Sequence, residues 1–138
     1  MVSNQWQGLA LAAAVAAIGV AGPARAAEMT VGIVSERAPP PAIYDQDPVP
    51  EDDGIAGGRL ALRDSNTTGR LVGMSFKLEE ALIDEDEDVV AAVEAMAAKG
   101  IQFVVLNVPA EKVLKASDAV KGRDILLFNA GAPEDSLR

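Results

Sequence analysis

The chain has 138 residues, which is enough for one domain and short for two. Its formal net charge is −9, so we expect no binding to nucleic acid and no attachment to anionic lipid, because both need basic patches. It contains no His and no Cys. Disulfides are therefore excluded within the chain, as are catalytic centres of the Ser-His-Asp or Cys-His kind.

Residues 1–26 have the pattern of a secretory signal peptide. The apolar run 8–21 is shorter than the roughly 20 residues that a membrane-spanning helix needs, and small residues Ala24 and Ala26 follow it at the spacing that signal peptidase requires. The segment before the run lacks Lys and Arg, and a buried or interfacial N-terminal helix is the alternative interpretation. We expect cleavage after Ala26, a domain of residues 27–138 in the periplasm, and no membrane insertion after cleavage.

The sequence of the first half of that domain predicts two strands, a long loop and a helix. Residues 29–34 are apolar and partly β-branched, which indicates a strand. Residues 36–58 are rich in Pro, Asp and Gly and indicate a loop, and a loop of this length is usually functional or disordered. Residues 58–67 predict a helix that ends near Gly69, and alternating polarity in 74–83 predicts a half-exposed strand.

The second half predicts two further units of helix and strand. Residues 89–100 have an apolar helical face, and residues 101–106 form a continuous apolar run that predicts a fully buried strand. Residues 109–122 predict a helix that begins at its proline, followed by a strand at 124–128 and the first turn of a helix at 134–138. The predicted inner face of the helix at 109–122 consists of four residues: Ala110, Val113, Leu114 and Val120.

Strands that alternate with helices predict an α/β fold, a doubly wound parallel sheet with helices on both faces. The half-exposed strand 74–83 belongs at an edge, and the apolar strands 101–106 and 124–128 belong inside, with Val105 buried on both sides. The predicted strand order is therefore 2-1-3-4. In such a sheet the ligand lies beyond the carboxyl ends of the strands, near the switch point between the first and third strands.

The acidic run at residues 84–88, DEDED, has the spacing of the first three ligands of a calcium loop. The sixth position is Val89 and the twelfth is Ala95, where such a loop needs Gly and a bidentate Glu. We therefore interpret the run as an acidic helix N-terminus that complements the helix dipole, and we expect no metal site.

The candidate ligand-binding residues lie at the predicted strand ends. Ser35 ends the first strand, Asn107 ends the third, and the fourth is followed by Asn129, Ala130, Gly131 and Ala132. Small polar residues there expose backbone N–H groups and amides near a helix N-terminus, which suits a carboxylate. The alternative is that these Asn and Gly residues only form turns. The chain has no glycine-rich phosphate loop, so we expect no nucleotide cofactor, and no other cofactor is predicted.

Long segments of the chain resemble one protein family. These are the signal peptide, GGRLALRDSNTTGRLVG, GIQFVVLNVPAEKVL and GRDILLFNAGAPEDSLR. Together they resemble the N-terminal lobe of the periplasmic solute-binding proteins of ABC transporters, type I, the branched-chain amino acid group. The segments RAPPPAIYDQDPVPEDDG, ALRDSNTTGR and LLFNAGAPEDSLR are similar to a subgroup associated with PQQ-dependent alcohol dehydrogenase systems of methylotrophic and related bacteria.

The resemblance implies solute binding without catalysis, in a protein of two lobes that close on a small solute of unknown identity and deliver it to an ABC permease. It implies ligand contacts at Asn107 and at residues 129–132. The hydroxyl residues that usually hold an amino acid are replaced there by Asn, Ala and Gly, which argues against an amino acid ligand. Family members are about twice as long, so the chain is expected to be a truncated N-terminal lobe. The alternative function is a secreted α/β protein-interaction module without a small-molecule ligand; an enzyme is the third possibility.

Overall fold

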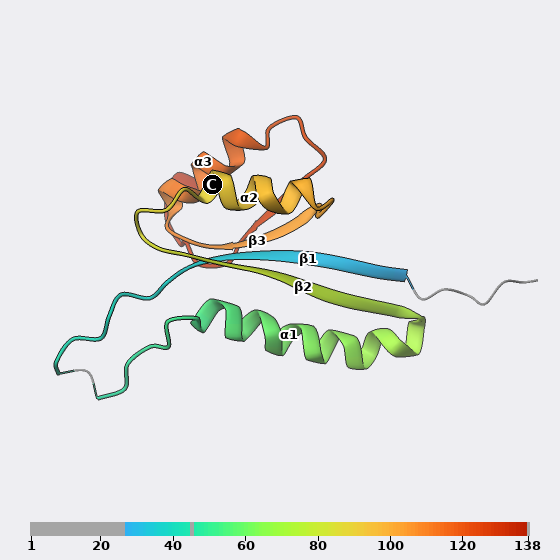
Figure 1. Cartoon of the computed structure of the whole chain (residues 1–138), viewed down its shortest axis with the longest axis horizontal. Helices are drawn as coiled ribbons and strands as arrows, with labels where there is room; N and C mark the ends of the chain where they lie inside the picture. The colour runs from blue at the N-terminus through green and yellow to red at the C-terminus, as the bar shows by residue number, and fades with distance from the viewer. Residues whose placement is uncertain (1–26, 45, 138) are drawn as a thin grey trace, which may run out of the picture.

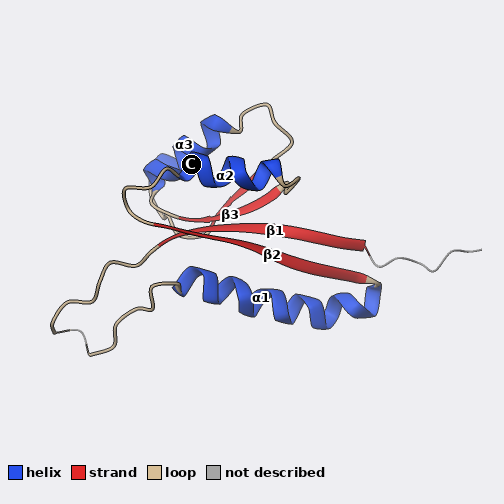
Figure 2. Cartoon of the chain, viewed as in Figure 1, coloured by secondary structure: helices blue, strands red, loops and turns tan. Residues whose placement is uncertain are grey.

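The computed structural model describes residues 27–44 and 46–137. The predictions about the signal peptide and its cleavage lie outside the described residues. In these residues the fold is α/β, with one four-stranded sheet in the order β2-β1-β3-β4 and every strand pair parallel (Figure 2). The predicted fold class and strand order are confirmed. Within the part of the chain that is described, no helix is both long and apolar enough to cross a membrane.

The strands are β1 (Ala27–Glu36), β2 (Met74–Ile83), β3 (Phe103–Asn107) and β4 (Leu126–Asn129). β1 pairs with β2 along its whole length and with β3 along its carboxyl half. The carboxyl ends of β1 and β3 therefore lie at the same edge, with the switch point between them.

Three α-helices of the described residues pack on the two faces of the sheet. α1 (Asp53–Gly69) lies on one face against β1 and β2, while α2 (Val89–Ala98) and α3 (Ala110–Ala119) lie on the other (Figure 1). Short 3-10 turns follow α1 at Arg70–Val72 and close the described chain at Asp135–Leu137.

The first helix begins five residues before its predicted start at Gly58. Two of the glycines in its first turns, Gly54 and Gly58, are closely packed. A Cβ on Gly58 would lie 3.0 Å from Cδ1 of Ile33 in β1, and a Cβ on Gly54 would overlap the side chain of Asn107. The predicted loop 36–58 is therefore shorter, and it ends at residue 52.

The hydrophobic core lies between the sheet and the pair α2–α3. Its fully buried members include Val34 from β1, Val104 and Leu106 from β3, and Val93 from α2. The predicted inner face of α3 is correct for Ala110, Val113 and Val120, but Leu114 is 44% exposed. Leu114 follows Val113 directly, and one residue of an α-helix turns the side chain by about 100°, away from the core.

The opposite face of the sheet is open over β3 and β4. Val104 and Leu106 are fully buried on the α2–α3 side, whereas Phe103 and Val105 alternate to the α1 side and are only half-buried. The prediction that Val105 is buried on both sides is therefore wrong, because α1 covers β1 and β2 and leaves β3 uncovered. β4 forms the edge of the described sheet and is not an inner strand. Leu126 and Phe128, register partners of Phe103 and Val105, are 53% and 46% exposed.

Candidate functional site

The predicted strand-end residues meet at the carboxyl edge of the sheet. Ser35 and Asn107 are register partners in β1 and β3, and Nδ2 of Asn107 donates a hydrogen bond of 2.9 Å to Oγ of Ser35. Ser35 is 1% exposed, so it is too deeply buried to contact a solute directly. Its role is to orient the Asn107 amide.

Two glycines enclose the Asn107 side chain. A Cβ on Gly131, in the loop after β4, would lie 2.5 Å from Oδ1 of Asn107. A Cβ on Gly54, in the first turn of α1, would overlap the same amide and lie 2.7 Å from Oγ of Ser35. Asn107 is thus held between α1 and the β4 loop. Gly54 was not among the predicted site residues, although a glycine in the first helical turn after a long loop is a signal of close backbone approach.

Asn129 has a different role from Asn107. Its Oδ1 accepts hydrogen bonds from the backbone N–H groups of Gly131 (3.3 Å) and Ala132 (2.9 Å), and its Nδ2 donates to the carbonyl oxygen of Ala132 (2.6 Å). The turn interpretation therefore fits Asn129. Ala130 donates its N–H to the carbonyl oxygen of Leu106 at 2.9 Å, which fixes the loop to β3.

Two hollows border Asn107. A shallow one of about 270 Å³ lies at the carboxyl edge, between Asn107, the start of α3 and loop residues Gly131 and Ala132. A groove of about 850 Å³ lies on the open face between α1 and the sheet. Its walls are mostly aliphatic, with Phe76 among them, and it reaches Asn107 and Ala130 at one end. The smaller hollow lies beyond the strand ends, where the ligand was predicted, and its lining includes two polar side chains, Asn107 and Glu134.

The carboxyl edge is reinforced by a half-buried ion pair. Nζ of Lys112 in α3 lies 2.6 Å from Oε2 of Glu36 at the end of β1, and both side chains are less than 20% exposed. The same Nζ donates to the carbonyl oxygens of Asp84 and Glu85. Lys112, in α3, therefore links this helix to the end of β1 and to the backbone of the acidic run.

The acidic run acts as a helix cap. Oδ1 of Asp88 accepts a hydrogen bond of 2.9 Å from the N–H of Val90 in the first turn of α2, and Oε2 of Glu87 accepts from the N–H of Asp84 at 2.7 Å. Across residues 27–44 and 46–137, no cluster of three or more Asp and Glu side chains is arranged to hold a metal ion.

A bidentate ion pair holds α1 in place. Arg59 donates from Nε and Nη2 to the two carboxylate oxygens of Glu80 in β2 at 2.8 and 2.7 Å, and from Nη1 to Asp52 at 2.9 Å. The hydrogen bond from Arg59 lowers the pKa of Glu80 below its usual range. This contact links α1 to β2 beside the turn that carries Gly54.

Comparison of the chain with protein-family models and with curated proteins found no match.

Proposed function

We propose that the chain is the extracytoplasmic solute-binding component of an ABC transporter, linked to PQQ-dependent alcohol oxidation, and that it supplies one lobe of the binding site. The observation that carries the proposal is the carboxyl edge of the parallel sheet. There Asn107 is fixed by Ser35 and by two glycines, beside a hollow of about 270 Å³.

The chemistry of this edge suits a small polar solute. The Asn107 amide offers both a donor and an acceptor, whereas the backbone N–H groups of residues 130–132 are already paired with Leu106 and with the Asn129 side chain. α3 begins at Ala110, directly behind the hollow, and the partial positive charge of a helix N-terminus favours a carboxylate or another electron-rich oxygen. No hydroxyl side chain lines the hollow to hold an α-amino acid, so small acids and alcohols are the first solutes to test. In this proposal the partner is an ABC permease that receives the solute from the two-lobed protein.

The proposal predicts weak solute binding by residues 27–138, because a single lobe leaves one side of the solute in water. A thermal-shift screen against small acids, alcohols, amino acids and quinone-related compounds tests it. A ligand present at about 100 times its Kd stabilises a protein by about 2.7 kcal/mol, so a specific solute produces a shift of several degrees. A longer version that supplies a second lobe is expected to bind the same solute more tightly, since closure adds the missing contacts.

Asn107→Ala is the informative variant. Loss of a buried hydrogen bond to the solute lowers the binding free energy by about 1–3 kcal/mol, which is expected to remove most of the ligand-induced rise in melting temperature. Gln102→Ala is the matched control, because Gln102 lies at the amino end of β3 and pairs with Asp124. A ligand-induced thermal shift that persists in Asn107→Ala contradicts the assignment of the site. A shift that is lost in Gln102→Ala as fully as in Asn107→Ala contradicts it as well.

A second candidate is a secreted protein-interaction module without a small-molecule ligand. The exposed apolar side chains of Leu126 and Phe128 favour it, since exposed apolar patches commonly mark protein interfaces. Under this alternative no solute in the screen stabilises the protein, whereas Leu126→Ser or Phe128→Ser abolishes binding of a protein partner.

A further inference from the structure

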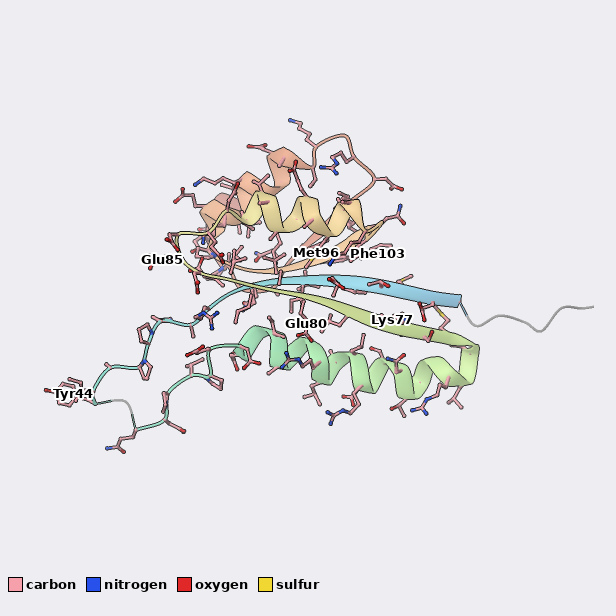
Figure 3. All side chains as sticks on the ribbon, viewed as in Figure 1. Tyr44, Lys77, Glu80, Glu85, Met96 and Phe103 are labelled. Carbon is pink, nitrogen blue, oxygen red and sulfur yellow. The ribbon has the colours of Figure 1, made fainter. Side chains whose placement is uncertain are left out.

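Residues 37–52 form a loop that projects away from the body of the protein; we name it the finger. It leaves the carboxyl end of β1 and returns to the start of α1, and its far end lies well beyond the sheet and the helices (Figure 1). Tyr44 lies at that far end (Figure 3). The finger takes no part in the proposed solute site.

The two ends of the finger are fastened together. Nη1 of Arg37 lies 2.6 Å from Oε2 of Glu51, and its Nε lies 2.7 Å from Oδ1 of Asp84. The N–H of Ala38 donates to the carbonyl oxygen of Glu51 at 3.3 Å. Exposed ion pairs are individually weak, but these contacts share Arg37 and bring both ends of the loop to one point. The finger therefore starts from a defined base.

The outgoing half of the finger is stiff because of its sequence. Pro39, Pro40 and Pro41 each fix their own φ angle, and each disfavours helical conformation in the residue before it. Such a segment favours the extended polyproline II conformation. Little conformational entropy is then lost when it is bound, which is why proline-rich segments are effective recognition elements.

The far end of the finger presents apolar side chains to solvent. Ile43 is 95% exposed, Tyr44 is 90% exposed and Val49 is 62% exposed. The returning half is acidic: three of the seven residues at 46–52 are Asp or Glu, and no Lys or Arg occurs between residues 38 and 58. Glu51 pairs with Arg37 and Asp52 pairs with Arg59, which leaves Asp47 as the acidic residue nearer the tip. The finger thus combines a stiff proline segment, an aromatic and aliphatic tip, and an acidic flank.

We propose that the finger is a docking element that binds a partner protein through residues 39–44. The partner carries an aromatic-lined groove of the kind that accepts polyproline II segments, bordered by Lys or Arg side chains that face the acidic flank. A second copy of this chain fits poorly as the partner. Its own groove on the open face is mostly aliphatic and contains Asp53, and two chains of net charge −9 repel each other.

Site-specific photo-crosslinking of the full chain, in the periplasm of the organism that encodes it, tests this proposal. A photoreactive phenylalanine at Tyr44 is expected to give one discrete adduct with another protein. The same residue at Leu71, which is 85% exposed on the 3-10 turn after α1, is the matched control and is expected to give none. No adduct at Tyr44, or an adduct with lipid, with a second copy or within the same chain, overturns the proposal.

The crosslinked protein is then purified and its affinity for the full chain is measured by calorimetry. Ile43→Ser and Tyr44→Ser are each expected to weaken binding at least tenfold, as loss of a central anchor does. Both variants should have the same melting temperature as the wild type, because the side chains of Ile43 and Tyr44 are almost fully exposed. Binding is also expected to weaken as the salt concentration rises, since opposite charges flank the contact. An affinity that does not respond to salt, or that neither variant changes, contradicts the proposed chemistry of the partner.

Discussion

Neighbouring valines in β3 provide a direct test of the open sheet face. Val104 is fully buried between β3 and the α2–α3 layer, whereas Val105 points to the uncovered side and is half-buried. In Val104→Asp, loss of apolar burial lowers the free energy of unfolding by about 2 kcal/mol. The buried carboxyl group has no partner, which lowers the free energy of unfolding further, by about 2 kcal/mol or more. Val105→Asp keeps its carboxylate in water and is expected to cost about 1–2 kcal/mol.

The assay is urea unfolding of residues 27–138, followed by far-ultraviolet circular dichroism. A domain of this size is stable by about 5–15 kcal/mol, so a loss of 4 kcal/mol moves the midpoint far more than a loss of 1–2 kcal/mol. If Val104→Asp does not fold, the pair Val104→Thr and Val105→Thr gives the same comparison, because only the hydroxyl at 104 is buried. Equal losses of unfolding free energy at the two positions would refute the conclusion that the sheet face at Val105 is open.

Three further predictions concern the acidic run, the α1 contact and export. Asp88→Ala should destabilise the protein by about 1 kcal/mol through loss of the α2 cap, and millimolar Ca²⁺ should leave the melting temperature unchanged; a saturable Ca²⁺-specific rise would contradict the cap interpretation. The lowered pKa of Glu80 means that its bond to Arg59 stabilises the fold above the carboxyl group's ordinary pKa of 4.5 and is lost as the pH falls through the lowered value. Stability should therefore fall less steeply below about pH 5 in Glu80→Gln than in the wild type, and equal slopes would argue against this linkage. Periplasmic protein from a Gram-negative host should have the intact mass of a chain that begins at Ala27, and a full-length cytoplasmic product would contradict cleavage after Ala26.

Hydrophobic periodicity was enough to predict the order of the strands and the position of each to within two residues. β2 begins and ends at the predicted residues, 74 and 83, because its alternating pattern is bounded by Gly73 in the left-handed region and by the acidic run. The parallel topology followed from the alternation of strands and helices. These features depend on local pattern, which a single sequence carries.

Features that depend on tertiary packing were not predictable in the same way. The start of α1 was missed because glycines have low helix propensity, and the close approach of Gly54 to Asn107 appears only when the two elements meet. The exposure of Val105 was missed because an apolar run does not state which face a helix will cover. Asn107 and Asn129 were alike as strand-end residues, but the hydrogen bond to Ser35 makes Asn107 a link between strands, whereas Asn129 closes its own turn.

The most direct test of the proposed solute site is a ¹H–¹⁵N NMR titration of residues 27–138 with the solutes of the thermal-shift screen at millimolar concentration. Weak binding in fast exchange is expected to shift the amide signals of Asn107, Val108 and residues 130–132 with one of the small acids or alcohols. The shifts should be lost in Asn107→Ala and kept in Gln102→Ala. Shifts confined to the groove beside α1, or no shifts with any solute, would contradict the account.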